Sequence, residues 1–245
     1  MILNLFPERI VKQLRYSNIC EGKFIKRHNR FLAEVYIDST KTMCHVKNTG
    51  RLKELLTEGA VVYLEKSRDP MRKTAYSLIS VQKGNRIVNI DSQAPNKVFY
   101  EALVNGKLNL PGFDEITYIK QESTYGSSRF DFYIENKSKS KAYIEVKGVT
   151  LETDGIVKFP DAPTVRGVRH IYELAEAIKS GFDAYIVFII QMNNIRYFTP
   201  NDDTHREFGE ALRYAEKNGV KVLAFECDVW PDRLELNGRQ CPVLL

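Results

Sequence analysis

The sequence predicts an α+β protein in which a small β-barrel is followed by a mixed sheet flanked by helices. Three observations predict this. Between Gly22 and Asp91, six short strand-like runs are separated by turn residues, with one short helical run among them. From Pro95 onward, runs with helical periodicity alternate with strand-like runs. With 245 residues, 43% of them apolar, the chain can bury the cores of two domains, which we place at 1–90 and 91–245.

The first domain is expected to be a barrel of the oligonucleotide-binding (OB) type. Several short strands and one small helix within about 70 residues are typical of that fold. The strands are expected at 23–28, 31–38, 41–46, 60–66, 75–82 and 86–91, and the helix at 51–56.

The second domain is expected to begin with a helix over 95–106, because Pro95 suits a first helical turn and Gly106 suits a helix end. Thr204, followed three residues later by Glu207, predicts a capping box at the start of the last helix. Hairpins followed by alternating strands and helices predict a mixed sheet with helices on its faces. The strands are expected at 115–123, 129–136, 141–149, 183–191 and 220–229, and the further helices at 164–181 and 203–219.

The compartment is predicted from cysteines and apolar runs. The four cysteines contain no C-x-x-C pair, which argues against a disulfide framework and a zinc finger, and Cys44 is read as a small apolar residue. The N-terminal stretch "MILNLFPERIVKQLRY" is interrupted by charges before a signal-peptide core develops. The longest apolar run, residues 184–190, is too short to cross a bilayer. We expect a cytoplasmic protein with no membrane partner, and nothing in the sequence fixes an oligomeric state.

Basic residues gather in the first third of the chain and alternate with aromatic residues such as Phe24, Phe31 and Tyr76. This combination holds nucleic-acid strands, because aromatic faces stack on bases and cations follow phosphates. The partner expected is DNA, with RNA or single strands as alternatives. The candidate nucleic-acid-binding residues in this domain are Lys26, Arg27, Arg30, Arg68, Arg72 and Lys73.

Two further candidates for nucleic-acid binding, Arg166 and Arg169, lie at the start of the 164–181 helix, where positive charge runs against the helix dipole. A bound phosphate would relieve this, and neutralisation by the nearby Asp161 is an equal alternative. His170 is read as a structural histidine rather than a metal ligand. His45, Asn48 and the Thr49–Gly50 turn either line a groove between the domains or form a local glycine turn.

The hairpin of strands 129–136 and 141–149 carries the main candidate site. Side chains alternate along a strand, so each strand has two faces. The core face is expected to carry Phe130, Phe132, Ile134, Ile144 and Val146. The other face carries Asp131, Tyr133, Tyr143, Glu145 and Lys147. With residues 136–140 as the loop, Asp131 falls opposite Glu145, their Cβ atoms about 5 Å apart.

Two opposed carboxylates repel each other unless something offsets their charge, and Mg²⁺ or Mn²⁺ would do so. Lys147, one step along the same face, would orient an attacking water or stabilise charge on a phosphate. The alternative is a solvated ion-pair cluster, worth about 0–1 kcal/mol. Asp131, Glu145 and Lys147 lie on a hairpin inside a mixed sheet, and this position favours the metal site over the ion-pair cluster.

This arrangement resembles the PD-(D/E)xK nuclease superfamily, in which an acidic residue on one strand faces an E-x-K sequence on the next. The resemblance implies that Glu101 supplies the acidic residue of the preceding helix and Gln191 a downstream glutamine that supports the site. A surface glutamate and a strand-end polar residue are the alternatives for these two. The implied catalytic residues are Asp131, Glu145, Lys147, Glu101 and Gln191, with Asp131, Glu145 and Glu101 as metal ligands.

Several longer strings are similar to the sugar fermentation stimulation protein A (SfsA) family, over about Phe24 to Ala224. They are "RFLAEV", "CHVKNTGRL", "YGSSRFDF", "IEVKGVTL", "FPDAPTVRGVRH" and "FIIQ". The resemblance implies an OB-like barrel, a nuclease-like second domain with "FPDAPTVRGVRH" beside its centre, and DNA binding without marked sequence preference. Gly148 departs from the bulkier residue that often follows E-V-K in this family.

Two function classes remain open from the sequence. The first is a DNA-binding protein without marked sequence specificity that carries a Mg²⁺-dependent nuclease-like, or phosphodiesterase, site. The alternative is a non-catalytic DNA-binding regulatory protein linked to sugar metabolism. An enzyme of sugar metabolism has no support from a phosphate loop or dinucleotide fingerprint, and no helix-turn-helix is evident.

Overall fold

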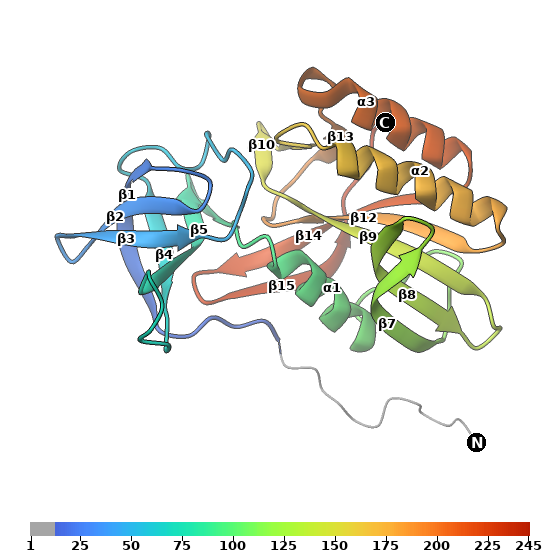
Figure 1. The fold of residues 1–245 in the computed structure, drawn as a ribbon, viewed down its shortest axis with the longest axis horizontal. Helices are drawn as coiled ribbons and strands as arrows, with labels where there is room; N and C mark the ends of the chain where they lie inside the picture. Colours follow the sequence, from blue (N-terminus) through green and yellow to red (C-terminus); the bar gives the residue numbers. More distant parts are fainter. Residues whose placement is uncertain (1–12) are drawn as a thin grey trace.

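The structure is a computed structural model that describes residues 13–245. Figure 1 shows a barrel, coloured blue to teal, beside a larger unit in which helices lie against a sheet. The expectation that no signal peptide is present falls mainly on residues 1–12 and lies outside the described residues. Within residues 13–245, no helix has the length and apolar character needed to span a membrane.

Six strands form the first unit in the spatial order β3-β2-β1-β4-β5-β6, and a parallel pairing of β3 with β5 closes the barrel. The predicted OB-like barrel is therefore confirmed. Burial alternates along its strands: in β2, Ala33, Val35 and Ile37 are buried while Tyr36 is exposed. The strands are β1 Ile19–Arg27, β2 Leu32–Ile37, β3 Thr40–Val46, β4 Val61–Lys66, β5 Tyr76–Lys83 and β6 Arg86–Asn89.

The prediction of a helix over 51–56 is wrong. Leu52 has a φ of 51°, in the left-handed region, which cannot continue a right-handed helix. The N–H groups of Leu55 and Leu56 both bond to the Leu52 carbonyl, so only a single turn forms. Leu52 and Leu55 are buried in the barrel core, and this burial holds the segment in place of helical hydrogen bonds.

The second unit is built on a six-stranded sheet in the order β15-β14-β12-β9-β8-β7. The central β12 pairs in parallel with β9 and β14, and the outer pairs are antiparallel, so the predicted mixed sheet is confirmed. The strand β15 was not expected from the sequence. The strands are β7 Ile116–Tyr125, β8 Ser128–Asn136, β9 Lys141–Val149, β12 Asp183–Ile190, β14 Lys221–Trp230 and β15 Arg233–Gln240.

Helices cover both faces of this sheet (Figure 1). The helix α1, Ala94–Val104, packs on one face with Phe99 against Phe132. The helices α2, Val165–Lys179, and α3, Asp202–Lys217, pack on the other face. Both faces of β9 are therefore buried. Phe130 lies with Tyr143 on the α2 side, so its expected place beside Phe132 is wrong.

The capping box expected at Thr204 and Glu207 does not form. His205 has non-helical angles, φ −157° and ψ 87°, so the regular part of α3 begins after it. The Thr204 hydroxyl instead accepts a hydrogen bond from Asn201 at 2.8 Å. In α2, by contrast, the Thr164 side chain caps the helix by accepting from the Gly167 N–H at 3.0 Å.

A small third sheet and several hydrogen bonds join the two units. The third sheet contains β10 Leu151–Thr153, β11 Ile156–Phe159 and β13 Tyr197–Pro200, none of which was expected from the sequence. The Leu52 N–H donates to Asp161 Oδ2 at 3.0 Å, and Lys83 pairs with Glu152 at 2.6 Å. Buried apolar residues of both units form one continuous core cluster. The units are thus packed together at a defined interface.

Candidate active site

Asp131 lies one residue beyond the last ladder pair of β8 and β9, which joins Phe132 to Ile144. The hairpin register agrees with the predicted one, and Asp131 lies close enough to Glu145 for that charge to raise its pKa, but its side chain contacts α1 whereas Glu145 contacts α2. Asp131 Oδ2 accepts a hydrogen bond from the Val146 N–H at 2.8 Å, and its Oδ1 accepts one from Asn96 Nδ2 at 2.7 Å. The carboxylate is thus fixed by the neighbouring strand and by α1.

Glu145 is buried, with 3% of its surface exposed. Its Oε1 is held by two donors, His170 Nδ1 at 2.7 Å and the Lys147 ammonium. Its Oε2 is buried and has no hydrogen-bond partner within the described residues. Buried carboxylate oxygens are nearly always paired, so an unpaired one marks a position that a water molecule, an ion or a ligand can occupy. Glu145 therefore presents one immobilised and one available oxygen.

The two carboxyl groups differ in acidity. Burial and then the charge of Glu145 raise the pKa of Asp131 to about 6. Burial also acts to raise the pKa of Glu145, but the hydrogen bond from His170 and the charge of Lys147 outweigh it and lower that pKa below its ordinary value. Environments that separate the pKa values of two neighbouring carboxyl groups in this way are typical of functional sites.

His170 connects this site to the surface of α2. It is 2% exposed and donates from Nδ1 to Glu145, while its Nε2 accepts from Arg166 Nε at 3.2 Å. Its interpretation as a structural histidine agrees with these contacts, because it fixes the orientation of Glu145. The i, i+4 spacing of Arg166 and His170 was the available sequence signal for this connection.

Glu101 does not join the site. Its Oε2 accepts from the Leu14 N–H at 2.9 Å, and the charges that act on it are those of Lys97, Glu235 and Lys107. Within residues 13–245 no group of three His, Cys, Asp or Glu side chains is placed to hold a metal ion. The expected metal trio is therefore not formed. The residue that α1 contributes is Asn96, which sequence reasoning missed because an amide is a weak signal.

Gln191 is buried and lies between the two units. Its Nε2 donates to Asn89 Oδ1 at 2.8 Å and to the Asp91 carbonyl at 3.1 Å. A Cβ at Gly148 would lie 2.6 Å from Gln191 Oε1 and 2.6 Å from Pro95 Cγ. The glycine that departs from the family pattern thus makes room for Gln191, which supports the end of β9 and the barrel junction.

Arg27 is a structural residue, which corrects its expected role in nucleic-acid binding. All five N–H donors of its guanidinium bond to backbone carbonyls, at 2.5–3.2 Å. No donor remains for a phosphate. The acceptors, which lie in two barrel loops, are the carbonyls of Asn29, Arg30, Asn48, Gly50 and Arg51.

The other basic candidates keep exposed charges. Arg72 donates to the Ser77 hydroxyl at 3.2 Å, and Lys26 lies 3.9 Å from Glu34. The exposed candidates without such a partner among the described residues are Arg30, Arg68, Lys73 and Arg169. Asp161 accepts from the Leu52 N–H at the interface between the units, and within the described residues it forms no ion pair with Arg166 or Arg169.

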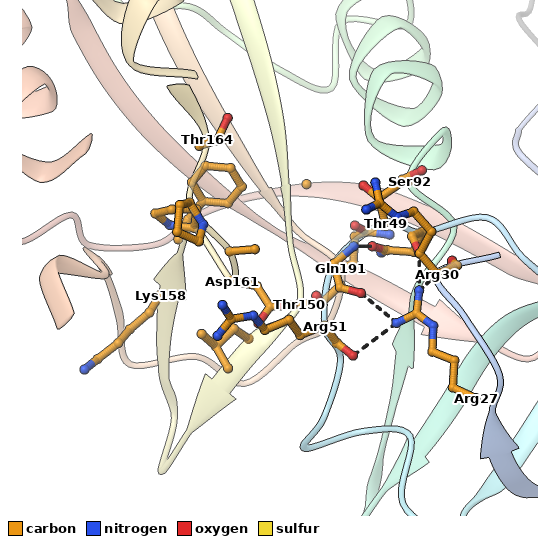
Figure 2. Close-up of a pocket in the computed structure, with 18 of the residues that line it drawn as sticks. Arg27, Arg30, Thr49, Arg51, Ser92, Thr150, Lys158, Asp161, Thr164 and Gln191 are labelled. Atoms are coloured by element: carbon orange, nitrogen blue, oxygen red, sulfur yellow. Dashed lines mark hydrogen bonds between the residues drawn. The ribbon is translucent and has the colours of Figure 1, made fainter. Parts of the chain in front are cut away.

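A cavity of about 780 Å³ lies between the barrel and the second unit (Figure 2). Asn48, Thr49 and Gly50 line this cavity, which agrees with the prediction that they line a groove between the domains. His45 is not in the lining and instead stacks on Phe31, with ring centroids 6.5 Å apart. Gly148 and Gln191 form part of its wall, so the cavity adjoins the strand that carries Glu145.

The raised pKa of Asp131 predicts an effect of pH on stability. The Asp131 carboxyl keeps its proton up to about pH 6 in the folded protein but releases it near pH 3.8 in the unfolded chain. The free energy of unfolding therefore falls as pH rises from about 3.8 to about 6. Asp131→Asn should therefore stabilise the metal-free protein at neutral pH by roughly 1–3 kcal/mol and have little effect below pH 3.8. Urea unfolding with a chelator measures this, and the exposed Asp114→Asn is the control. A difference that does not vary with pH would contradict it.

Comparisons with known proteins cover most of the chain. Residues 25–90 match the SfsA N-terminal OB domain, and residues 93–233 match the sugar fermentation stimulation protein RE domain. Sugar fermentation stimulation protein homologs from Clostridium beijerinckii and Ruminiclostridium cellulolyticum are 53% and 55% identical, each over 91% of this chain and 96% of the relative. The structure of Pyrococcus furiosus SfsA in complex with Ca²⁺ matches 96% of this chain and all of that one, with 29% identity and a TM-score of 0.84.

Proposed function

Because this chain belongs to the SfsA family, we propose that it binds DNA without marked sequence specificity and carries a divalent-cation-dependent phosphodiesterase site. In this proposal residues 1–90 contribute to strand binding and residues 91–245 carry the chemistry. The observation that carries the proposal is the unpaired, buried Oε2 of Glu145 beside Asp131.

The donor set fits a hard divalent cation such as Mg²⁺ or Mn²⁺. Such ions prefer oxygen ligands, and Mg²⁺ in particular uses one or two carboxylates and completes its shell with water and phosphate oxygens. Asp131 and Glu145 would hold the ion, so the absence of a third acidic ligand among the described residues is compatible with binding. The Ca²⁺ complex of the Pyrococcus furiosus relative supports a site for a divalent ion. When bound, such an ion supplies charge stabilisation and lowers the pKa of a water molecule.

The protein side chains have separate roles in this proposal. Lys147 is held at Glu145 with 18% of its side chain exposed, so its ammonium can stabilise negative charge on a phosphate oxygen. His170 fixes Glu145 Oε1 and leaves Oε2 free for the ion. Gln191 acts through the position of the β9 end, since its contacts are to Asn89, Asp91 and Gly148.

DNA is the proposed partner because exposed cations are present on both units. Arg30, Arg68 and Lys73 extend from the barrel, and Arg166 and Arg169 from the start of α2. Contacts of this kind bind phosphates and do not read bases, so sequence preference is expected to be weak. Binding should weaken steeply as salt rises, because counterions released from DNA drive it.

A non-catalytic DNA-binding protein is the second candidate. The observation that favours it is the pairing of Glu145 Oε1 with both Lys147 and His170, which by itself forms a stable buried cluster. Glu101, which the nuclease resemblance implied as a ligand, also lies apart from this cluster. This candidate predicts DNA binding with no dependence on divalent ions.

The two candidates are separated by replacing Lys147. Lys147→Met keeps the side-chain length and removes the charge, so cleavage of labelled duplex DNA in Mg²⁺ or Mn²⁺ should fall by about a hundredfold. DNA affinity, measured by fluorescence anisotropy over a salt series, should change less than about threefold. The exposed Lys141→Met on the same strand is the matched control. Binding without any cleavage by the unmodified protein would instead support the non-catalytic candidate.

A further inference from the structure

The cavity between the two units has walls that are fixed from both sides. Arg27 holds the barrel loops through five carbonyls, and Asp161 of the second unit accepts from the Leu52 N–H at 3.0 Å. Gly50 lies so close to this contact that a Cβ there would be 2.9 Å from both Asn48 Oδ1 and Asp161 Oδ2. The cavity is therefore formed by the packing of the units and does not depend on a ligand to shape it.

The charge of the lining is positive. Arg30 and Arg51 enter it from the barrel, and Figure 2 shows the Arg51 side chain extending into the cavity. Neither guanidinium has an ion pair or a side-chain hydrogen bond in the part of the chain that the structure describes. Asp161, the carboxylate in the lining, is already engaged by the Leu52 N–H. Two planar, unpaired guanidinium groups suit an anion such as phosphate, which they can bind in a bidentate manner.

Another part of the lining is mostly apolar. Phe159, the last residue of β11, and the following Pro160, Ala162 and Pro163 line the cavity in one segment that is interrupted only by Asp161. Phe159 is held in place by Phe188 and Phe208, with ring centroids 5.6 and 5.1 Å away. A wall of proline and aromatic side chains offers a surface for a flat, partly apolar group such as a nucleobase.

The cavity has the size and location for one nucleotide. Its volume of about 780 Å³ lies within the range of small-ligand pockets. Gly148 in its wall is three residues beyond Glu145 on β9, which corresponds to about 10 Å along a strand. A nucleic-acid strand that places a phosphodiester at Glu145 therefore passes the mouth of the cavity.

We propose that this cavity binds one unpaired nucleotide of a nucleic-acid strand, with the phosphate at Arg30 and Arg51 and the base against the Phe159–Pro163 segment. This rests on the proposed function and names its substrate class: strands with unpaired nucleotides, such as single strands and overhanging ends. A base in a fully paired duplex would have to leave its stack before it enters, which costs free energy. Unpaired strands are therefore bound in preference to blunt duplex.

The test is binding in a chelator, so that it does not depend on cleavage. The full chain is titrated into labelled single strand, overhanging duplex and blunt duplex, with deoxyadenosine 5′-monophosphate as a competitor. The unmodified protein should bind the first two about tenfold more tightly than blunt duplex. Arg30→Ala combined with Arg51→Ala should remove this preference, and so should Thr49→Trp, which fills the cavity without changing charge. The melting temperature of each variant checks its folding.

Arg68→Ala combined with Lys73→Ala is the control, because these exposed barrel cations lie outside the cavity lining. This double variant should lower the affinity for all three oligonucleotides by the same factor. Equal affinity of the unmodified protein for paired and unpaired strands would overturn the cavity proposal while DNA binding itself stands. Binding of the mononucleotide with no preference among strands would also overturn it and make a free nucleotide the occupant. Binding to none of the oligonucleotides would instead overturn the proposed function.

Discussion

Glu145→Gln is expected to abolish divalent-ion binding and to reduce DNA cleavage by about a thousandfold. The substitution keeps the shape of the side chain and an oxygen that accepts from His170, but it removes the negative charge that would hold the ion. The readout that does not depend on activity is ion-induced stabilisation, since an ion that binds only the folded state raises the melting temperature. Mn²⁺ should stabilise the unmodified protein and leave the variant unchanged.

Glu135→Gln is the matched control for this experiment. Glu135 is also a strand carboxylate of the same hairpin, but it accepts from the Tyr133 hydroxyl at 2.6 Å and has no contact with Glu145 or Asp131. It should retain both the Mn²⁺ stabilisation and the cleavage. Equal stabilisation of Glu145→Gln and the unmodified protein by Mn²⁺ would show that the ion binds elsewhere, and the assignment of Glu145 as a ligand would be lost.

Arg27→Ala is expected to have the largest effect on stability. The change leaves five backbone carbonyls without their donor, and each lost hydrogen bond of this kind contributes about 1 kcal/mol, less where water can replace it. A loss of about 2–4 kcal/mol in the free energy of unfolding follows. Arg27→Lys should recover only part of it, because an ammonium has three donors and no planar fork. Urea unfolding measures both values.

Lys26→Ala provides the comparison for Arg27. It removes the neighbouring exposed cation, whose weak pair with Glu34 at 3.9 Å is worth about 0–1 kcal/mol. If Arg27 instead bound DNA directly, Arg27→Ala would lower DNA affinity at unchanged stability. That outcome would restore the role predicted from the sequence and contradict the carbonyl contacts.

The sequence predicted most of the elements and the register of the hairpin. Alternating burial and helical spacing are local patterns, so the barrel strands, the mixed sheet and its three flanking helices were found within a few residues. The errors have local causes as well. The segment 51–56 has a helical pattern, but burial of Leu52 and Leu55 with a left-handed Leu52 overrides it. The strands of the third sheet are only three or four residues long, too short to show a period.

The sequence by itself thus determined the family, the fold class and the register of the hairpin from Phe132 to Glu135, because the hydrophobic pattern and the loop length fix which residues of the two strands pair. Only the tertiary structure decided that Asn96 and not Glu101 meets Asp131, that Arg27 is bound to carbonyls, and that a cavity lies beside β9. These contacts join segments far apart in the chain, such as Leu52 and Asp161, 109 residues from each other. Their partners are set by how the two units pack, which no local pattern encodes.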